Sequence, residues 1–300
     1  MSSRAGSELA AAAGGSVRQA SLWSDAWREL RRNPVFVVAG LLLVLLSVMA
    51  VLPELFTRTD PLSCDLANSR GGPGTNGAWF GYDLQGCDLY ANVVYGARVS
   101  MAIGLLVVGG SLVIGVTLGA LAGFYGGWFD SLLSRITDIF FGLPLILGAI
   151  VLLNAFTGDR GLLQVSLALI AFSWMTILRL LRSSVLSVTC TDYVQAARAL
   201  GASDWRILTT HILPNAIAPV LVYSTIFIGG IIAAEATLSF LGIGLQKPSI
   251  SWGLQINEAR GFVRTSPYLL LVPSAFLSVT VLCFIMLGDA LRDALDPKLR

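Results

Sequence analysis

The sequence predicts an all-α membrane protein that crosses the lipid bilayer six times. Hydrophobic residues make up 55% of the 300 residues, charged residues make up only 13%, and the mean hydropathy is +0.75. These values exclude a water-soluble globule of this size. Six segments are also apolar over the roughly 20 helical residues that a hydrocarbon layer about 30 Å thick requires.

The expected spans are residues 34–53, 99–124, 136–156, 162–188, 214–241 and 268–291. Residues 1–33 are polar and rich in arginine, which predicts a retained anchor rather than a cleaved signal peptide. Trp23 and Trp27 lie at i and i+4, with arginines on the opposite side, so we expect an amphipathic helix along the membrane interface in this tail.

The distribution of basic residues predicts the orientation, because segments rich in Lys and Arg tend to stay in the cytoplasm. If the N-terminus is cytoplasmic, most of the 20 Lys and Arg residues fall on the cytoplasmic side. Both termini are then cytoplasmic, including a short tail at 292–300. The polar loop at 54–98 lies outside, and residues 99–291 form one membrane core.

The outer loop contains Cys64 and Cys87, both on the oxidising side of the membrane. We expect a disulfide between them, worth about 3 kcal/mol of loop order in the chain-entropy model. The alternative is a pair of free thiols, which mass spectrometry of non-reduced peptides would detect.

In the second span, Gly115, Gly119 and Gly123 recur at every fourth position. This spacing predicts that a neighbouring helix approaches closely along one face, the alternative being a lumen lining. At the start of the third span, Asp138 lies three residues after Arg135, and we expect a local ion pair there.

Several functions are excluded by what the chain lacks. Its two lysines, Lys247 and Lys298, are followed by Pro and Leu, so neither belongs to a nucleotide-binding P-loop. One histidine, His211, and four scattered cysteines offer little for a metal site, and a net charge of +2 does not indicate a nucleic-acid partner. We expect no catalytic residue, metal or cofactor on this chain.

The most informative segment is the cytoplasmic loop at 190–214. Asp192 and Gln195 have the form of a capping box, so a helix is expected from about 192 to 200, where Gly201 ends it. Ser203 would cap a second helix over 204–210, and Pro214 suits the first turn of the fifth span. Tyr193, Arg198, Trp205 and Arg206 would be exposed, and their residue types are enriched at interface centres.

This loop resembles the EAA loop of ATP-binding-cassette (ABC) importer permeases. The matching residues are Ala196, Ala197, Gly201, Leu213 and Pro214. HILPN at 211–215, YGARVS at 95–100, the stretch at 234–253 and GDALRDALDP at 288–297 are similar to the dipeptide, oligopeptide and nickel branch of that family. The resemblance extends from about residue 81 to the C-terminus.

The resemblance implies the type I importer permease fold in a bacterial cytoplasmic (inner) membrane, and a peptide cargo. It also implies a second homologous permease as heterodimer partner, two ATPase domains that bind ATP and magnesium, and an extracytoplasmic solute-binding protein. In that family the EAA loop docks into the ATPase subunit. Nickel chelates or another small solute are the alternative cargo within the same class.

Two positions depart from the family pattern. Gln195 replaces the glutamate of the EAA motif, so an ion pair would become a neutral hydrogen bond. Cys87 replaces an arginine of the outer-loop element at 81–98, which exchanges a charge for a crosslink.

Glu235 is an acidic residue inside an expected span, near its outer end. A charged group in the membrane must face protein or water, so it lines the translocation path or gate, or else makes a structural hydrogen bond to a neighbouring helix. An ion-coupled secondary transporter would need further carboxylates at mid-depth, and an intramembrane enzyme would need a nucleophile with a base; the sequence favours neither.

Overall fold

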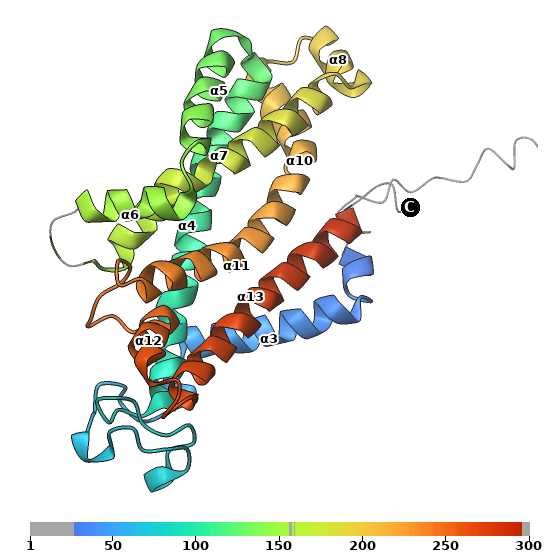
Figure 1. Cartoon of the computed structure of the whole chain (residues 1–300). Coiled ribbons are helices and arrows are strands. Elements are labelled where there is room, and N and C mark those ends of the chain that lie inside the picture. The colour runs from blue at the N-terminus through green and yellow to red at the C-terminus, as the bar shows by residue number, and fades with distance from the viewer. Residues whose placement is uncertain (1–26, 156–157, 159, 296–300) are drawn as a thin grey trace, which may run out of the picture.

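Five helices of the computed structural model are long and apolar enough to cross a membrane, and a bent pair of helices has, taken together, the length and composition of a sixth span (Figure 1). The structure describes residues 27–155, 158 and 160–295. The five helices are α3 (Pro34–Val51), α4 (Leu89–Tyr125), α7 (Leu162–Thr189), α11 (Ala218–Phe240) and α13 (Tyr268–Leu295). The bent pair is α5 (Gly127–Phe141) and α6 (Leu145–Ala155).

Short helices occupy the connections. They are η1 (Pro53–Leu55), η2 (Leu66–Asn68), η3 (Thr75–Gly77), α8 (Asp192–Ala199), α9 (Asp204–Arg206), η4 (Ile207–Ile212), α10 (Leu213–Ala216), α12 (Trp252–Ala259) and η5 (Arg260–Phe262). The loop at 52–88 lies at one end of the molecule with α12, and α8 lies at the other end (Figure 1). We call these the loop end and the α8 end.

The first span begins where the sequence predicts. The side chain of Asn33 accepts a hydrogen bond from the backbone N–H of Val35 at 2.9 Å, and Pro34 occupies the first turn, where no N–H is needed. The interfacial helix expected around Trp23 and Trp27 lies outside the described residues up to residue 26. Residues 27–30 are helical, and Leu30 packs on Ala290 and Ala294 near the end of α13.

The second span begins much earlier than the expected residue 99. Asp88 caps α4 by accepting hydrogen bonds from the N–H groups of Tyr90 and Ala91, so the helix starts at Leu89. The outer loop expected at 54–98 therefore ends about ten residues too late. Arg98 instead lies within the helix, where its guanidinium donates to the carbonyl groups of Ala50 and Val51, at 3.1 Å each. These two carbonyl groups lie at the end of α3, where the helix itself supplies no N–H donor, so the Arg98 guanidinium supplies their hydrogen bonds.

The third span is not the single helix expected at 136–156. Helix α5 starts at Gly127, and the chain turns by 87° before α6 begins at Leu145. Pro144 stands at the break and cannot donate a backbone hydrogen bond, which explains why α5 does not continue through it. Asp130 in α5 contacts Arg182 near the α8 end, and Arg160 after α6 donates to the carbonyl of Ile243 beyond α11.

Helices α4 and α7 pack closely through glycines, as the sequence predicts. A methyl group added to Gly119 would lie 2.6 Å from the carbonyl oxygen of Leu178, and one added to Gly115 would lie 2.7 Å from Ile177. At Gly123 the nearest atom would be the carbonyl oxygen of Arg182, at 2.9 Å. Only hydrogen at these positions lets the two backbones approach so closely.

We therefore predict that Gly119→Ala destabilises the protein by about 1–3 kcal/mol, because backbone atoms cannot move aside for the added methyl group. The measurement is the thermal unfolding temperature of the purified protein in detergent. Gly109→Ala is the matched control, since it lies in the same helix with no atom within 4 Å of the added methyl group. Equal unfolding temperatures for both variants would contradict the role of Gly119.

Candidate functional site

The loop between α7 and α11 begins with helix α8, close to the predicted bounds, but its start is built differently. Thr191, not Asp192, is the N-cap residue, and no side-chain capping bond forms. Gln195 does not reach back to the cap, because its amide donates to the carbonyl of Thr189 at 3.0 Å. The expected capping box is therefore wrong, and Gln195 instead ties α8 to the end of α7.

Gly201 ends α8 with a left-handed turn. Its φ is +81°, a conformation that favours glycine, and its N–H donates to the carbonyl of Arg198. The next N–H, of Ala202, reaches back to the carbonyl of Ala197 at 3.1 Å. This is the Schellman pattern, which explains why a glycine is needed at this position and why the chain reverses here.

The second half of the loop is a continuous run of three short helical segments rather than the single helix expected at 204–210. Helix α9 passes into a π-helical segment, η4, and then into α10. Pro214 lies in the first turn of α10 as predicted, exposed, with Leu213 half-buried beside it. His211 is half-buried, and its carbonyl accepts a hydrogen bond from the Asn215 side chain.

The inner side of this loop is apolar and fully packed. Val194, Ile207, Leu208 and Ile212 are buried. They share one cluster with buried residues of α7, namely Ile177, Leu181 and Val185. Because protein interiors pack densely, a displacement of the loop must be passed to α7.

The outer side of the loop carries exposed apolar and charged residues. Tyr193 is 45% exposed, Trp205 is 69% exposed, and Leu200 is 88% exposed. The sequence analysis missed Leu200, although a leucine directly before the glycine that ends a helix was an available signal. Asp192, Gln195, Ala196, Arg198, Asp204 and Arg206 are also exposed, and Ala197 is half-buried. This surface has the composition of a protein interface, with aromatic and arginine side chains around an apolar group.

Two ion pairs connect α5 to α7 near this loop. The guanidinium of Arg182 contacts both carboxylate oxygens of Asp130, one of them at 2.6 Å. Arg179 pairs with Asp138 at 2.5 Å, closer than the expected local partner Arg135, which lies 3.7 Å from Asp138. Bidentate pairing of this kind holds α5 in a defined position on α7.

Glu235 lies in α11 near the loop end and is fully buried. Its Oε1 accepts hydrogen bonds from the hydroxyl groups of Ser239 at 2.7 Å and Ser251 at 3.3 Å. Ser251 also caps α12, because its hydroxyl oxygen accepts from the N–H of Leu254. Glu235 thus joins α11 to the start of α12.

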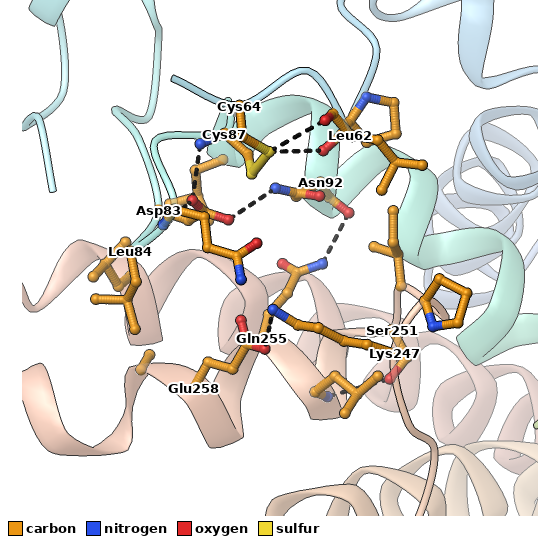
Figure 2. A pocket seen from close by; sticks show the side chains of 18 of the residues that line it. Leu62, Cys64, Asp83, Leu84, Cys87, Asn92, Lys247, Ser251, Gln255 and Glu258 are labelled. Carbon is orange, nitrogen blue, oxygen red and sulfur yellow. Dashed lines mark hydrogen bonds and ion pairs between the residues drawn. A yellow bond between two sulfur atoms is a disulfide. The ribbon is translucent and has the colours of Figure 1, made fainter. Parts of the chain in front are cut away.

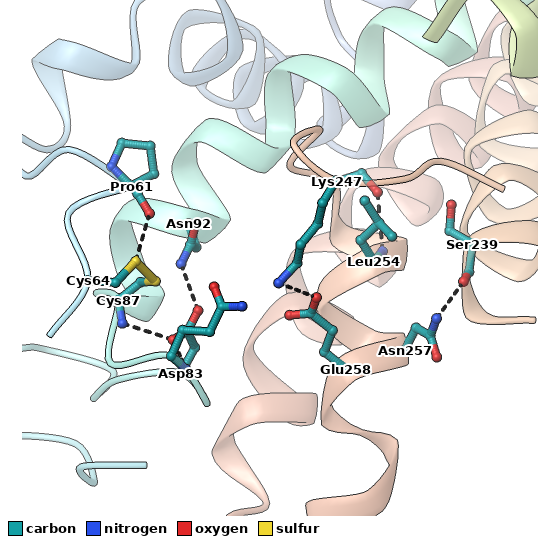
Figure 3. A network of polar contacts seen from close by, with 12 residues as sticks. Pro61, Cys64, Asp83, Cys87, Asn92, Ser239, Lys247, Leu254, Asn257 and Glu258 are labelled. Carbon is teal, nitrogen blue, oxygen red and sulfur yellow. Dashed lines mark hydrogen bonds and ion pairs between the residues drawn. A yellow bond between two sulfur atoms is a disulfide. The ribbon is translucent and has the colours of Figure 1, made fainter. Parts of the chain in front are cut away.

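At the loop end, Cys64 and Cys87 form a disulfide (Figure 3). Asp83 lies beside it and accepts hydrogen bonds from the N–H groups of Cys87 and Gln85, both at 2.8 Å. Burial raises the pKa of Asp83 above its usual value, and these two hydrogen bonds partly offset the effect. The Asn92 amide donates to the other carboxylate oxygen at 3.3 Å.

Two family models match the chain. Residues 115–300 match the binding-protein-dependent transport system inner membrane component, and residues 21–73 match the N-terminal transmembrane domain of oligopeptide transport permease C. The first match covers the α8 loop, Glu235 and all helices from α5 to α13.

Curated relatives are similar over nearly their whole length. The dipeptide transport system permease protein DppC of Alkalihalophilus pseudofirmus is 39% identical over 93% of this chain and 91% of its own. The glutathione transport system permease protein GsiD of Pectobacterium atrosepticum is 39% identical over 93% and 92%. The oligopeptide transport system permease protein OppC of Bacillus subtilis is 36% identical over 95% and 92%.

Solved structures share the fold. A chain of the MetNI methionine ABC transporter in an inward-facing conformation aligns with a TM-score of 0.55 and 21% identity, over 68% of this chain and 96% of its own. A chain of an amino acid ABC transporter aligns with a TM-score of 0.53 and 16% identity, over 66% and 91%. The apolar helices, the α8 loop and the family matches agree: this chain belongs to the binding-protein-dependent transport inner membrane components, and it is a multi-pass permease of an ABC importer.

Proposed function

We propose that this chain is one of two homologous permease subunits that together form the translocation path of an importer for short peptides. The relatives' names support the cargo, since dipeptides, glutathione and oligopeptides are all short peptides. ATP and magnesium would be bound by two separate ATPase domains, and a solute-binding protein would deliver the cargo. This chain supplies the path and the mechanical connection, and no cofactor is bound by it.

The observation that carries the mechanism is the two-sided structure of the α8 loop. Its outer side presents Leu200, Trp205 and Tyr193 to a partner, and its inner side is packed into α7. When ATP closes the ATPases, a helix seated in them moves with them. The buried residues then pass this movement to α7, and the Arg182–Asp130 pair passes it to α5. A change in tilt of these helices would give alternating access.

The proposed orientation places the α8 end in the cytoplasm and the loop end outside. Arg198 and Arg206 on the α8 loop, together with the basic tail before α3, support it by the positive-inside rule. The same orientation places the Cys64–Cys87 disulfide on the oxidising side.

We assign Glu235 a structural role rather than a place in the translocation path. Its side chain is fully buried, and both hydroxyl groups that donate to it belong to buried serines, Ser239 and Ser251. Its Oε1 is occupied by these two hydroxyl groups, and its Oε2 is buried and has no hydrogen-bond partner among the described residues. The carboxylate is therefore enclosed by protein between α11 and α12. Its function is to hold α12 against α11.

The coupling role predicts that Leu200→Asp and Trp205→Ser each lower solute uptake and solute-stimulated ATP hydrolysis by about tenfold or more, because a central apolar interface residue is worth about 2 kcal/mol. Both are measured on the transport complex in proteoliposomes. Leu200→Met and Trp205→Phe are the matched controls and should retain activity. If the Asp and Ser variants transport normally while assembled in the membrane, the α8 loop is not the coupling element.

The structural role of Glu235 predicts opposite results for two substitutions. Glu235→Gln keeps an acceptor for both serine hydroxyls, so uptake kinetics should stay within about twofold. Glu235→Leu removes that acceptor and should destabilise the protein by about 2 kcal/mol or more, seen as a lower thermal unfolding temperature. Loss of uptake in Glu235→Gln with unchanged thermal stability would instead place the carboxylate in the translocation path.

A further inference from the structure

A cavity of about 430 Å³ lies at the loop end, and nothing in the coupling mechanism uses it. One side is formed by the outer loop and the first turn of α4, and the other by residues 247–251 and helix α12 (Figure 2). Its volume falls within the range of small-molecule sites, about 300–1,000 Å³. It is far from the α8 loop, which lies at the opposite end of the molecule.

The residues around the cavity carry more negative than positive charge. Glu258 pairs with Lys247 at 2.7 Å, with the ammonium group at the cavity wall (Figures 2 and 3). Asp83 faces them across the cavity, and no ion pair joins it to a Lys or Arg within the described part of the chain. Two carboxylates therefore share a single ammonium group, which leaves an excess negative charge for a cationic ligand.

Hydrogen-bond acceptors are also in excess. The side-chain nitrogen of Gln255 donates to the carbonyl of Asn92 at 2.8 Å, which fixes the amide so that its oxygen is the free atom. That oxygen is buried and has no hydrogen-bond partner among the described residues. Among the described residues, the Oδ2 atom of Asp83 receives only the long bond from Asn92, at 3.3 Å. A primary ammonium group has three donors and no acceptor, so it matches this set of atoms.

Most of the remaining lining is apolar, apart from Gln85, Ser249 and Ser251. Leu62 and Leu84 contribute from the outer loop, Ile250 and Leu254 from the α12 side, and Leu269 from the start of α13. A ligand that places an ammonium group between Asp83 and Gln255 can therefore bury an aliphatic side chain against these residues. The chemistry selects an amphipathic primary amine over a free inorganic cation.

We infer that this cavity binds the ammonium end of a small amphipathic amine, specifically the N-terminus of a short peptide with an apolar side chain. The identification of that amine as cargo rests on the proposed function, whereas the binding chemistry does not. Ser251 lines the cavity and donates to Glu235, so an occupant contacts the same α12 that Glu235 attaches to α11. The cavity is thus an external contact site for cargo, connected to the membrane helices through α12.

The first test measures equilibrium binding of leucyl-leucine amide to the full chain, within its purified complex, in lipid nanodiscs. N-acetyl-leucyl-leucine amide is the matched probe, because acetylation converts the ammonium group into a neutral amide. We expect the acetylated probe to bind at least about tenfold more weakly, since it lacks the charge and keeps only one of the three donors. Equal binding of the two probes, or no binding of either, overturns the inference.

The second test uses two variants that change the charge in opposite directions. Glu258→Gln leaves Lys247 without its partner and should weaken binding of leucyl-leucine amide by about tenfold, whereas Lys247→Met should strengthen it several-fold. Arg135→Met at the α8 end, where the side chain is 84% exposed, is the control for removal of a cation and should change nothing. A purely steric effect would change the affinity of both cavity variants for leucyl-leucine amide in the same direction, and that result would overturn the inference.

The location is checked with a leucyl-leucine amide that carries a photoreactive diazirine side chain. We expect crosslinks within residues 83–92 or 247–259, and crosslinks confined to other regions overturn the site.

Uptake of leucyl-leucine by the same complex separates this inference from the proposed function. Binding with the predicted charge dependence but no ATP-driven uptake contradicts the function alone, and ATP-driven uptake with unchanged binding in both charge variants contradicts the cavity alone.

Discussion

The close contact between α4 and α7 supports both ends of this molecule. In a bilayer, lipid tails are as apolar as leucine side chains, so helices associate through tight packing rather than through the hydrophobic effect. Gly115, Gly119 and Gly123 supply that packing by bringing the α4 backbone against α7. Helix α7 leads directly into α8, and α4 starts directly after the outer loop. The pair therefore connects the α8 loop, the proposed coupling surface, with the cavity at the loop end.

Three charged groups of the membrane helices reinforce this framework, since each pairs with a group on another element. Arg98 satisfies the carbonyl groups that end α3, Arg182 holds α5 on α7, and Glu235 holds α12 on α11. A charge in lipid is costly, so such residues persist where a partner removes the cost. In this permease they define which helices move together, which is what a transporter that changes access from one side to the other requires.

The two surfaces differ in construction according to their tasks. The α8 loop is convex, with exposed Leu200 and Trp205 above a packed apolar base, as suits a rigid element seated in a partner. The loop end is concave, with Asp83 and Gln255 facing apolar side chains, as suits a small ligand. The helix framework lies between them, so a signal from one surface to the other would pass through the α4–α7 pair and the helices packed on it.

The sequence alone determined the features that depend on local composition. Apolar length predicted the spans, the spacing of glycines predicted the α4–α7 contact, and the EAA-like residues around Gly201 predicted the family and the helix that ends there. Only the tertiary structure decided the early start of α4, the 87° bend between α5 and α6, the exposure of Leu200 and the partners of Glu235. The physical reason is that a polar residue in an apolar segment suggests the end of a membrane span until the group that it pairs with is known. For Arg98 that partner lies 47 residues away and for Gln255 it lies 163 residues away, beyond the reach of any local pattern.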